Sequence, residues 1–276
     1  LSRRQRQMCI RDRNVQLEFV LKKKAFTLSE ILLTIAVLGI VAAMTMPGLI
    51  SNYKIKVYVV QLEKSLSQFE QAMQNIMVKH ECTDMLCTSV FDGQVSDADW
   101  NKRFGNEITK AIKIINTAEN GTAMSPHITS ISLKPKDAIT EDVDWRSTKG
   151  YKFMTPDGAF YLVEPKQCEA VPYPKLSTLK NICAEVTVDV NSQRLPNQYG
   201  RDIFKFVVGQ NGHLYAMYGS DYARSVYGDA TLTGSNYWAS NSSLCAGEGL
   251  LIAAPANVSG YGCAARVIES NWKMTY

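Results

Sequence analysis

Histidine is scarce in this chain, and the common catalytic signatures are missing. The 276 residues include three histidines, His80, His127 and His213, which lie on unrelated parts of the sequence. There is no glycine-rich phosphate loop, no paired-carboxylate motif and no G-x-S-x-G turn. A histidine-based nucleophile relay or metal cage therefore has no support from motifs. We predict that the chain is not an enzyme.

Basic charge is also missing from most of the chain, although the formal net charge is +4. Residues 1–25 contain eight Lys or Arg and two acidic residues, which leaves a net charge of −2 for residues 26–276. A slightly acidic body exerts no large attraction on phosphates, so nucleic acid is not indicated as a partner. Residues 1–13 resemble translated sequencing-adapter read-through; the alternative is a genuine basic cytoplasmic tail.

The cysteines lack the spacing of a metal site. No pair forms a C-x-x-C motif, and six of the seven follow the apolar segment described next. An even number of cysteines in that position favours disulfides over zinc. Several pairings are possible, and sequential pairing is expected because each pair then brackets a short segment: Cys82 with Cys87, Cys168 with Cys183, and Cys245 with Cys263.

One long apolar run stands out at residues 26–50, where Glu30 is the only charged residue. At about 1.5 Å per residue, a helix of this length spans a bilayer core. Three lysines, at positions 22–24, precede it, and such basic flanks predict an N-in, C-out orientation. A carboxylate inside an apolar helix costs a few kcal/mol, so we expect something to neutralise Glu30.

The residues at the start of this run resemble the type IV pilin and type II secretion pseudopilin superfamily. The sequence reads Ala25, then Phe-Thr-Leu-Ser-Glu from Phe26 to Glu30, after a basic leader. The resemblance implies that a prepilin peptidase cuts between Ala25 and Phe26 and methylates the new amino group. It also implies that Glu30 of an incoming subunit pairs with Phe26 of its neighbour. Ala25 and Ser29 depart from the usual Gly and Ile or Val.

The same resemblance implies partners and a location. The partners would be other pilin-like subunits, prepilin peptidase, and an inner-membrane assembly platform with its ATPase. The precursor would lie in the bacterial inner membrane and then enter an extracytoplasmic filament or reach the cell surface. Pro47, followed by Gly48, is the expected helix kink. The alternatives are a secretory signal cut after Ala43 or a plain single-span anchor.

The rest of the chain predicts a helix continuation and a head. Apolar residues recur at spacings of three and four up to residue 78, which is typical of a helix with one buried face. A second helix is expected over residues 97–116. Hairpins are expected around Pro156-Asp157-Gly158 and Asn211-Gly212, with a further strand over 185–190, while residues 218–262 are expected to be mostly loop.

The predicted fold class is therefore α+β and pilin-like, with a long N-terminal helix packed on a C-terminal antiparallel sheet. Its expected parts are a basic leader (14–25), a transmembrane helix that forms the filament core (26–50), an amphipathic continuation (51–78) and an exported, disulfide-containing head (79–276). We expect no cofactor, with one exception. Asp189, Asn191 and Asp202 are suitable calcium ligands, although Arg194 breaks an EF-hand pattern and simple turn-capping is the alternative.

These observations predict a structural subunit of a type IV pilus-like or type II secretion pseudopilus filament. One alternative is a minor pilin-like protein that adheres to a surface, takes up DNA or initiates assembly. The other is a membrane-anchored secreted hydrolase with an unrecognised site.

Overall fold

The structure is a computed structural model that describes residues 26–93, 98–118, 150–192, 194, 197–228, 245 and 260–274. The predicted leader (14–25) and residues 1–13 lie outside the described residues. The chain divides into two compact units, one up to Ile50 and one from Ser51.

The longest element is the helix α1 (Leu28–Lys79), which contains Pro47 and contributes to both units. Its residues from Ser51 onward bury one face against the head. The buried positions keep the predicted spacing of three and four residues, which places them on one side of the helix: Val59, Leu62, Leu66, Phe69, Met73 and Ile76. The amphipathic pattern of the sequence therefore becomes the contact surface of this half of α1.

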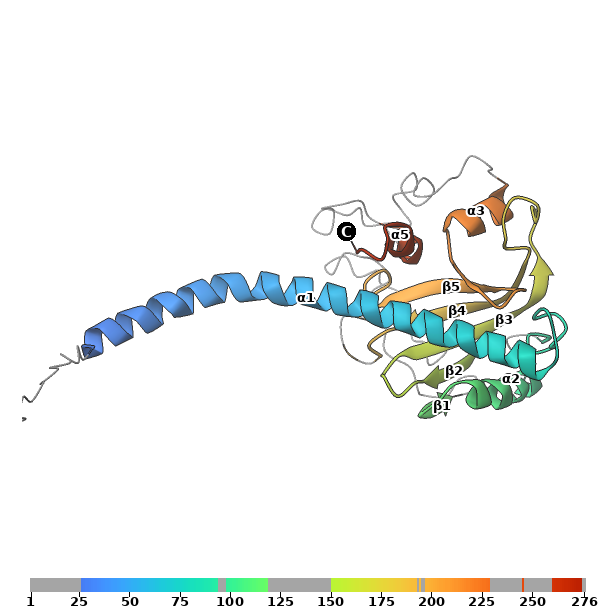
Figure 1. Cartoon of the computed structure of the whole chain (residues 1–276), viewed down its shortest axis with the longest axis horizontal. Helices are drawn as coiled ribbons and strands as arrows, with labels where there is room; N and C mark the ends of the chain where they lie inside the picture. Colours follow the sequence, from blue (N-terminus) through green and yellow to red (C-terminus); the bar gives the residue numbers. More distant parts are fainter. Residues whose placement is uncertain are drawn as a thin grey trace, which may run out of the picture. The chain divides into compact units, whose positions relative to one another are not determined.

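The head contains a six-stranded antiparallel sheet in sequential order (Figure 1). The two predicted hairpins form around the expected turns, and Gly212 at the second turn has φ +75°, a conformation that favours glycine. The strands are β1 (Asn116–Ala118), β2 (Tyr151–Met154), β3 (Phe160–Ala170), β4 (Asn181–Asp189), β5 (Ile203–Gly209) and β6 (Leu214–Ala216).

The main core lies between this sheet and the second half of α1, which crosses one face of the sheet in Figure 1. Tyr161 of β3 is fully buried, stacks on Phe69 with ring centroids 5.8 Å apart, and donates a hydrogen bond to the Ser65 carbonyl at 3.1 Å. Glu70 accepts the Leu214 N–H at 2.8 Å, and Gln74 donates to the Asn211 carbonyl at 3.0 Å. Helix α1 is thus anchored on both the centre and the β5–β6 end of the sheet. The predicted α+β, pilin-like fold class is confirmed.

Among its described residues the head has three further helices, α2 (Ala98–Ala111), α3 (Ser220–Tyr227) and α5 (Cys263–Glu269). The expected helix over 97–116 is too long at its C-terminal end, because Ile115 donates its N–H to the Met154 carbonyl and residue 116 begins β1. The expectation that 218–262 is mostly loop misses α3. That helix ends at Gly228, which adopts φ +75° as a left-handed C-cap.

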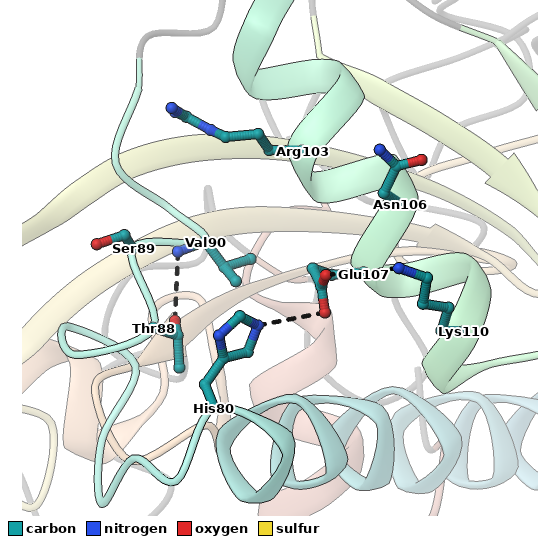
Figure 2. Close-up of a pocket in the computed structure, with 8 residues that line it drawn as sticks. All are labelled: His80, Thr88, Ser89, Val90, Arg103, Asn106, Glu107 and Lys110. Carbon is teal, nitrogen blue, oxygen red and sulfur yellow. Dashed lines mark hydrogen bonds and ion pairs between the residues drawn. The ribbon is translucent and has the colours of Figure 1, made fainter.

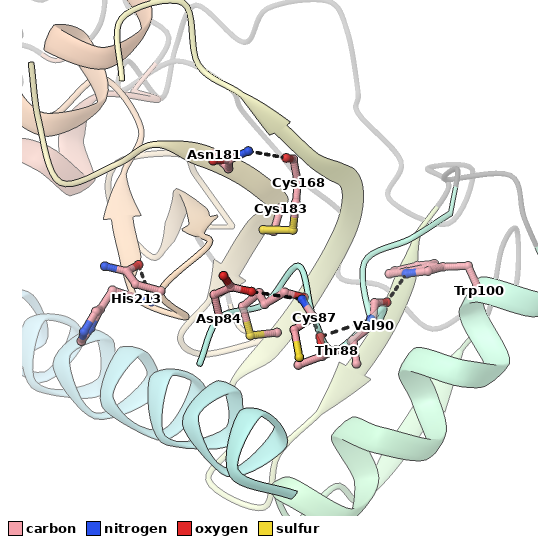
Figure 3. Close-up of a disulfide and its surroundings, with 11 residues drawn as sticks. Asp84, Cys87, Thr88, Val90, Trp100, Cys168, Asn181, Cys183 and His213 are labelled. Atoms are coloured by element: carbon pink, nitrogen blue, oxygen red, sulfur yellow. Dashed lines mark hydrogen bonds between the residues drawn. A yellow bond between two sulfur atoms is a disulfide. The ribbon is translucent and has the colours of Figure 1, made fainter. Parts of the chain in front are cut away.

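The structure contains the sequential disulfides Cys82–Cys87, Cys168–Cys183 and Cys245–Cys263. Figure 3 shows the region of the first two. Cys82 and Cys87 close a short loop after α1, within which Asp84 accepts the Cys87 N–H at 3.0 Å. Asn181 donates to the Cys168 carbonyl at 2.7 Å, so the β3–β4 disulfide is reinforced by a hydrogen bond between the same strands.

Candidate functional site

The first half of α1 is apolar, and its side chains enter no core formed by the described residues. The large apolar residues of this half are exposed, for example Leu38 at 66%. The helix is long and apolar enough to cross a membrane by length and composition. Its two threonine hydroxyls donate to the helix backbone, Thr34 to the Ile31 carbonyl and Thr45 to the Val41 carbonyl, both at 2.9 Å. Such internal hydrogen bonds suit a segment without access to water.

Glu30 is engaged at the N-terminus of this helix in a capping box. Its carboxylate Oε2 accepts the N–H and the hydroxyl of Thr27, each at 2.8 Å, and its own N–H donates to Thr27 Oγ1 at 3.3 Å. The pattern is the reciprocal Thr-x-x-Glu arrangement that begins many helices. Thr27 therefore provides hydrogen bonds to Glu30 within the same chain but no countercharge, and the expected neutralising partner stays a prediction. The sequence reasoning overlooked this role of Thr27.

The other predicted residues of this segment take different places. Phe26 precedes the helix and is exposed, whereas Ala25 lies outside the described residues. Pro47 and Gly48 both lie within α1, so the helix continues through them. A side chain added at Gly48 would meet no atom within 4 Å in the described chain, so packing within the chain does not require glycine there.

The head brings the predicted calcium ligands together at the β4–β5 connection. Val190 donates its N–H to the Asp202 carbonyl at 2.9 Å, and the Asp189 carboxylate accepts the Asn191 N–H at 3.0 Å. The Asp202 carboxylate accepts the N–H groups of Asn197 at 2.9 Å and Gln198 at 2.6 Å. We call Asp189, Asn191, Ser192 and Asp202 the oxygen cluster.

The two carboxyl groups of the oxygen cluster are buried without a cation. Burial raises the pKa of Asp189 well above its ordinary value, and the neighbouring Asp202 charge raises it further. Burial likewise raises the pKa of Asp202 to about 6, against the lowering effect of its hydrogen bonds. No Lys, Arg or His forms an ion pair with either group among the residues that the structure describes. A proton or a cation must compensate these buried carboxyls.

The cluster also contains oxygens that lack hydrogen bonds within the described part of the chain. They are the buried Asp189 Oδ2, Asn191 Oδ1 and Ser192 Oγ, and the last was overlooked in the sequence reasoning. All are hard oxygen donors of the kind that Ca²⁺ prefers. No group of three or more His, Cys, Asp or Glu that could hold a metal occurs among the described residues, so any cation here would rely on the Asn and Ser oxygens.

The oxygen cluster also touches α1. Asn191 donates its side-chain N–H to the Tyr58 hydroxyl at 3.3 Å, and Tyr58 lies on the second half of the helix. Arg194, which argued against a cation in the sequence, is exposed. The conformation of the β4–β5 connection therefore affects a contact between the head and the second half of α1.

Comparison with known proteins gives one match. Residues 21–46 match the model of the prokaryotic N-terminal methylation motif, which confirms the predicted pilin-type start over that segment. The match supports a substrate of prepilin peptidase of the type IV pilin or pseudopilin kind, a class of structural subunits. No curated protein and no solved structure gave a significant match.

Proposed function

We propose that this chain is a structural subunit of a type IV pilus-like or type II secretion pseudopilus filament. The observation that carries the proposal is the contrast within α1, whose first half is apolar and exposed while its second half is built into the head. An apolar helix of this kind is stable in lipid, or among copies of itself. The matched methylation motif supports the same conclusion.

The proposed maturation removes the leader between Ala25 and Phe26 and methylates Phe26. The new amino group would then be a cation four residues before Glu30, and Glu30 of an incoming subunit would pair with Phe26 of its neighbour. A low dielectric strengthens such a pair. The capping box supports this role, because it fixes Glu30 beside the end of the helix before assembly. Prepilin peptidase, an assembly platform and its ATPase are the partners that this route requires.

The test of maturation is to express the precursor with and without a prepilin peptidase and determine the mature N-terminus by mass spectrometry. We expect cleavage before Phe26 and a methyl group on it, only when the peptidase is present. An intact leader, or a cut after Ala43, would overturn the proposal and leave an anchored or secreted protein.

The test of assembly is Glu30→Ala in cells that form the filament. We expect the yield of sheared filaments to fall at least about tenfold, since an uncompensated amine or a lost pair in low dielectric costs more than about 1.4 kcal/mol. Glu63→Ala is the matched control, because Glu63 is an exposed carboxylate on the second half of α1. Equal filament yields for both variants would contradict the assembly role and favour the membrane-anchored hydrolase.

We further propose that the oxygen cluster binds Ca²⁺ through Asp189, Asn191, Ser192 and Asp202. The orphaned oxygens and the two uncompensated carboxyls support this reading over turn-capping alone. A bound cation would compensate both carboxylates and hold the β4–β5 connection against Tyr58 of α1. The bound cation would stabilise the head and would take part in no reaction.

A further inference from the structure

A polar pocket with a volume of about 280 Å³ lies between α2 and the loop that follows α1. Figure 2 shows its two walls, with Arg103, Asn106, Glu107 and Lys110 on α2, and His80 and the loop of residues 88–90 opposite. The four α2 residues fall on one face, because they are spaced by three, one and three positions. We call this site the α2 pocket.

The walls of the α2 pocket are held by contacts outside it. Trp100 is fully buried and donates its indole N–H to the Val90 carbonyl at 2.8 Å, which ties the loop to α2 (Figure 3). Within the loop, Thr88 donates to the Met85 carbonyl at 2.7 Å. The Cys82–Cys87 disulfide closes the preceding turn. Because its walls are already fixed, the pocket can bind a ligand with little loss of conformational entropy in the loop.

Charge in the α2 pocket is unevenly compensated. Glu107 pairs with two cations, with Lys79 Nζ at 2.5 Å and Lys110 Nζ at 3.9 Å from its carboxylate oxygens, and His80 Nε2 lies at 3.3 Å. The hydrogen bond from Lys79, with that from His80, holds the pKa of Glu107 below its ordinary value. Arg103 donates only to the neutral Asp92 carbonyl and pairs with no carboxylate among the described residues. One guanidinium charge is therefore left for a ligand.

We propose that the α2 pocket binds a hexuronate, an acidic sugar, with its carboxylate on Arg103 and its hydroxyls on Asn106 and Glu107. A guanidinium fork matches a carboxylate in a bidentate fashion. The Asn106 side chain has no hydrogen-bond partner in the described chain, and an amide can both donate to and accept from sugar hydroxyls. Val90 provides an apolar surface for the C–H face of the ring, and the volume admits about one ring.

The lining disfavours a simple oxyanion or nucleic acid. The Glu107 carboxylate can accept hydroxyl donors, which acetate and phosphate diesters lack. Three cations, Lys79, Arg103 and Lys110, face the single carboxylate of Glu107, which is still short of the row of cations that makes phosphate-backbone binding strong. The ligand that satisfies both Arg103 and Glu107 carries one negative charge together with several O–H groups.

This inference extends beyond the proposed filament role and does not depend on it. Ligand binding by the head would place the chain among minor subunits with a recognition function, the alternative that the sequence left open. The test below needs neither leader cleavage nor assembly. Failure of the sugar site and failure of the filament proposal are therefore distinguishable.

The experiment is saturation-transfer difference NMR on the full chain in detergent micelles, with glucuronate as the probe. Glucose, acetate and inorganic phosphate serve as comparison probes that carry only the hydroxyls, only the carboxylate, or an oxyanion without a ring. We expect glucuronate to bind at least about tenfold more tightly than any of the three, since two sets of contacts are engaged together. Equal binding of acetate, or tighter binding of phosphate, would overturn the proposal.

Variants assign the signal to the α2 pocket. Arg103→Gln should weaken the binding of glucuronate at least about tenfold. Arg103→Lys keeps the charge without the planar guanidinium and should weaken binding less. Asn106→Ala should narrow the preference for glucuronate over acetate, and it leaves the Arg103 contact with the Asp92 carbonyl in place. Lys102→Gln is the matched control, because it removes the same charge from the adjacent exposed position outside the pocket. Unchanged binding in both Arg103→Gln and Asn106→Ala would overturn the assignment.

Discussion

The two halves of α1 share one backbone helix and differ in what surrounds them. Before Ile50 the large apolar side chains are exposed, as at Leu38 with 66%. After Ser51 the apolar positions Leu62 and Phe69 are fully buried against the sheet. The comparison shows that the second half of α1 forms a core with the head, whereas the first half buries no comparable apolar face among the described residues. Each prediction below tests one side of that contrast.

The largest effect is expected from Phe69→Ala. Deleting this fully buried ring removes its stacking on Tyr161 and leaves a cavity, which should lower the free energy of unfolding by about 3–5 kcal/mol. Leu38→Ala, in the exposed half, should leave the head unchanged. Urea unfolding followed by tryptophan fluorescence, to which the buried Trp100 contributes, measures both. Comparable losses of unfolding free energy in Phe69→Ala and Leu38→Ala would contradict the difference between the two halves of α1.

The next effect concerns the disulfide between β3 and β4. Replacing both Cys168 and Cys183 by serine opens a loop of 15 residues, which should cost roughly 3 kcal/mol by chain entropy. The same replacement at Cys82 and Cys87, which are five positions apart, should cost less. Urea midpoints of the two double variants give the comparison. A larger loss for the shorter loop would show that chain entropy does not govern these bonds.

Calcium should stabilise the head through the oxygen cluster. At a free concentration of about 100 times its dissociation constant, a ligand that binds only the folded state adds about 2.7 kcal/mol. We expect Ca²⁺ to raise the melting temperature of the full chain relative to EGTA, and Asp189→Asn to abolish the increase. Asp221→Asn, at an exposed carboxylate of α3, should retain it. A response that survives in Asp189→Asn would place the cation elsewhere.

The smallest effect is a pH dependence at Glu164. Burial raises the pKa of Glu164, and Glu185, its direct cross-strand neighbour, raises it further. A raised folded-state pKa gives stability that is fully present below the unfolded pKa and is lost as the pH rises through the folded value. The free energy of unfolding of Glu164→Gln should therefore increase relative to that of the wild type, by up to about 1 kcal/mol, as the pH rises from about 4 to about 7. Parallel stability profiles would contradict this sign.

Much of the fold follows from local patterns in the sequence. The apolar run and the continuing three- and four-residue spacing predict a helix to residue 78, and α1 ends at Lys79. The turn chemistry of Pro156-Asp157-Gly158 and Asn211-Gly212 predicts two hairpins that the sheet contains. These features depend on neighbours in sequence, and this is why single-sequence reasoning reaches them.

The elements that were missed depend on partners far away in the chain. The three-residue strand β1 exists through its pairing with β2, and α3 is a short polar helix whose Ser220 is fixed by Glu269 of α5. The α2 pocket carried a signal, since Arg103, Glu107 and Lys110 share one helical face. Charged residues on one face are also typical of a solvent-exposed helix, and the pocket exists because the loop after α1 lies opposite that face.

The capping box makes Glu30 a hydrogen-bond acceptor already within the single chain, before any pairing with a neighbouring subunit. Within a single chain Thr27 donates two hydrogen bonds to the Glu30 carboxylate, so a subunit outside a filament would keep these hydrogen bonds and still lack a countercharge. For the proposed filament protein, assembly would therefore supply the countercharge that the free subunit lacks, while the capping box stays in place.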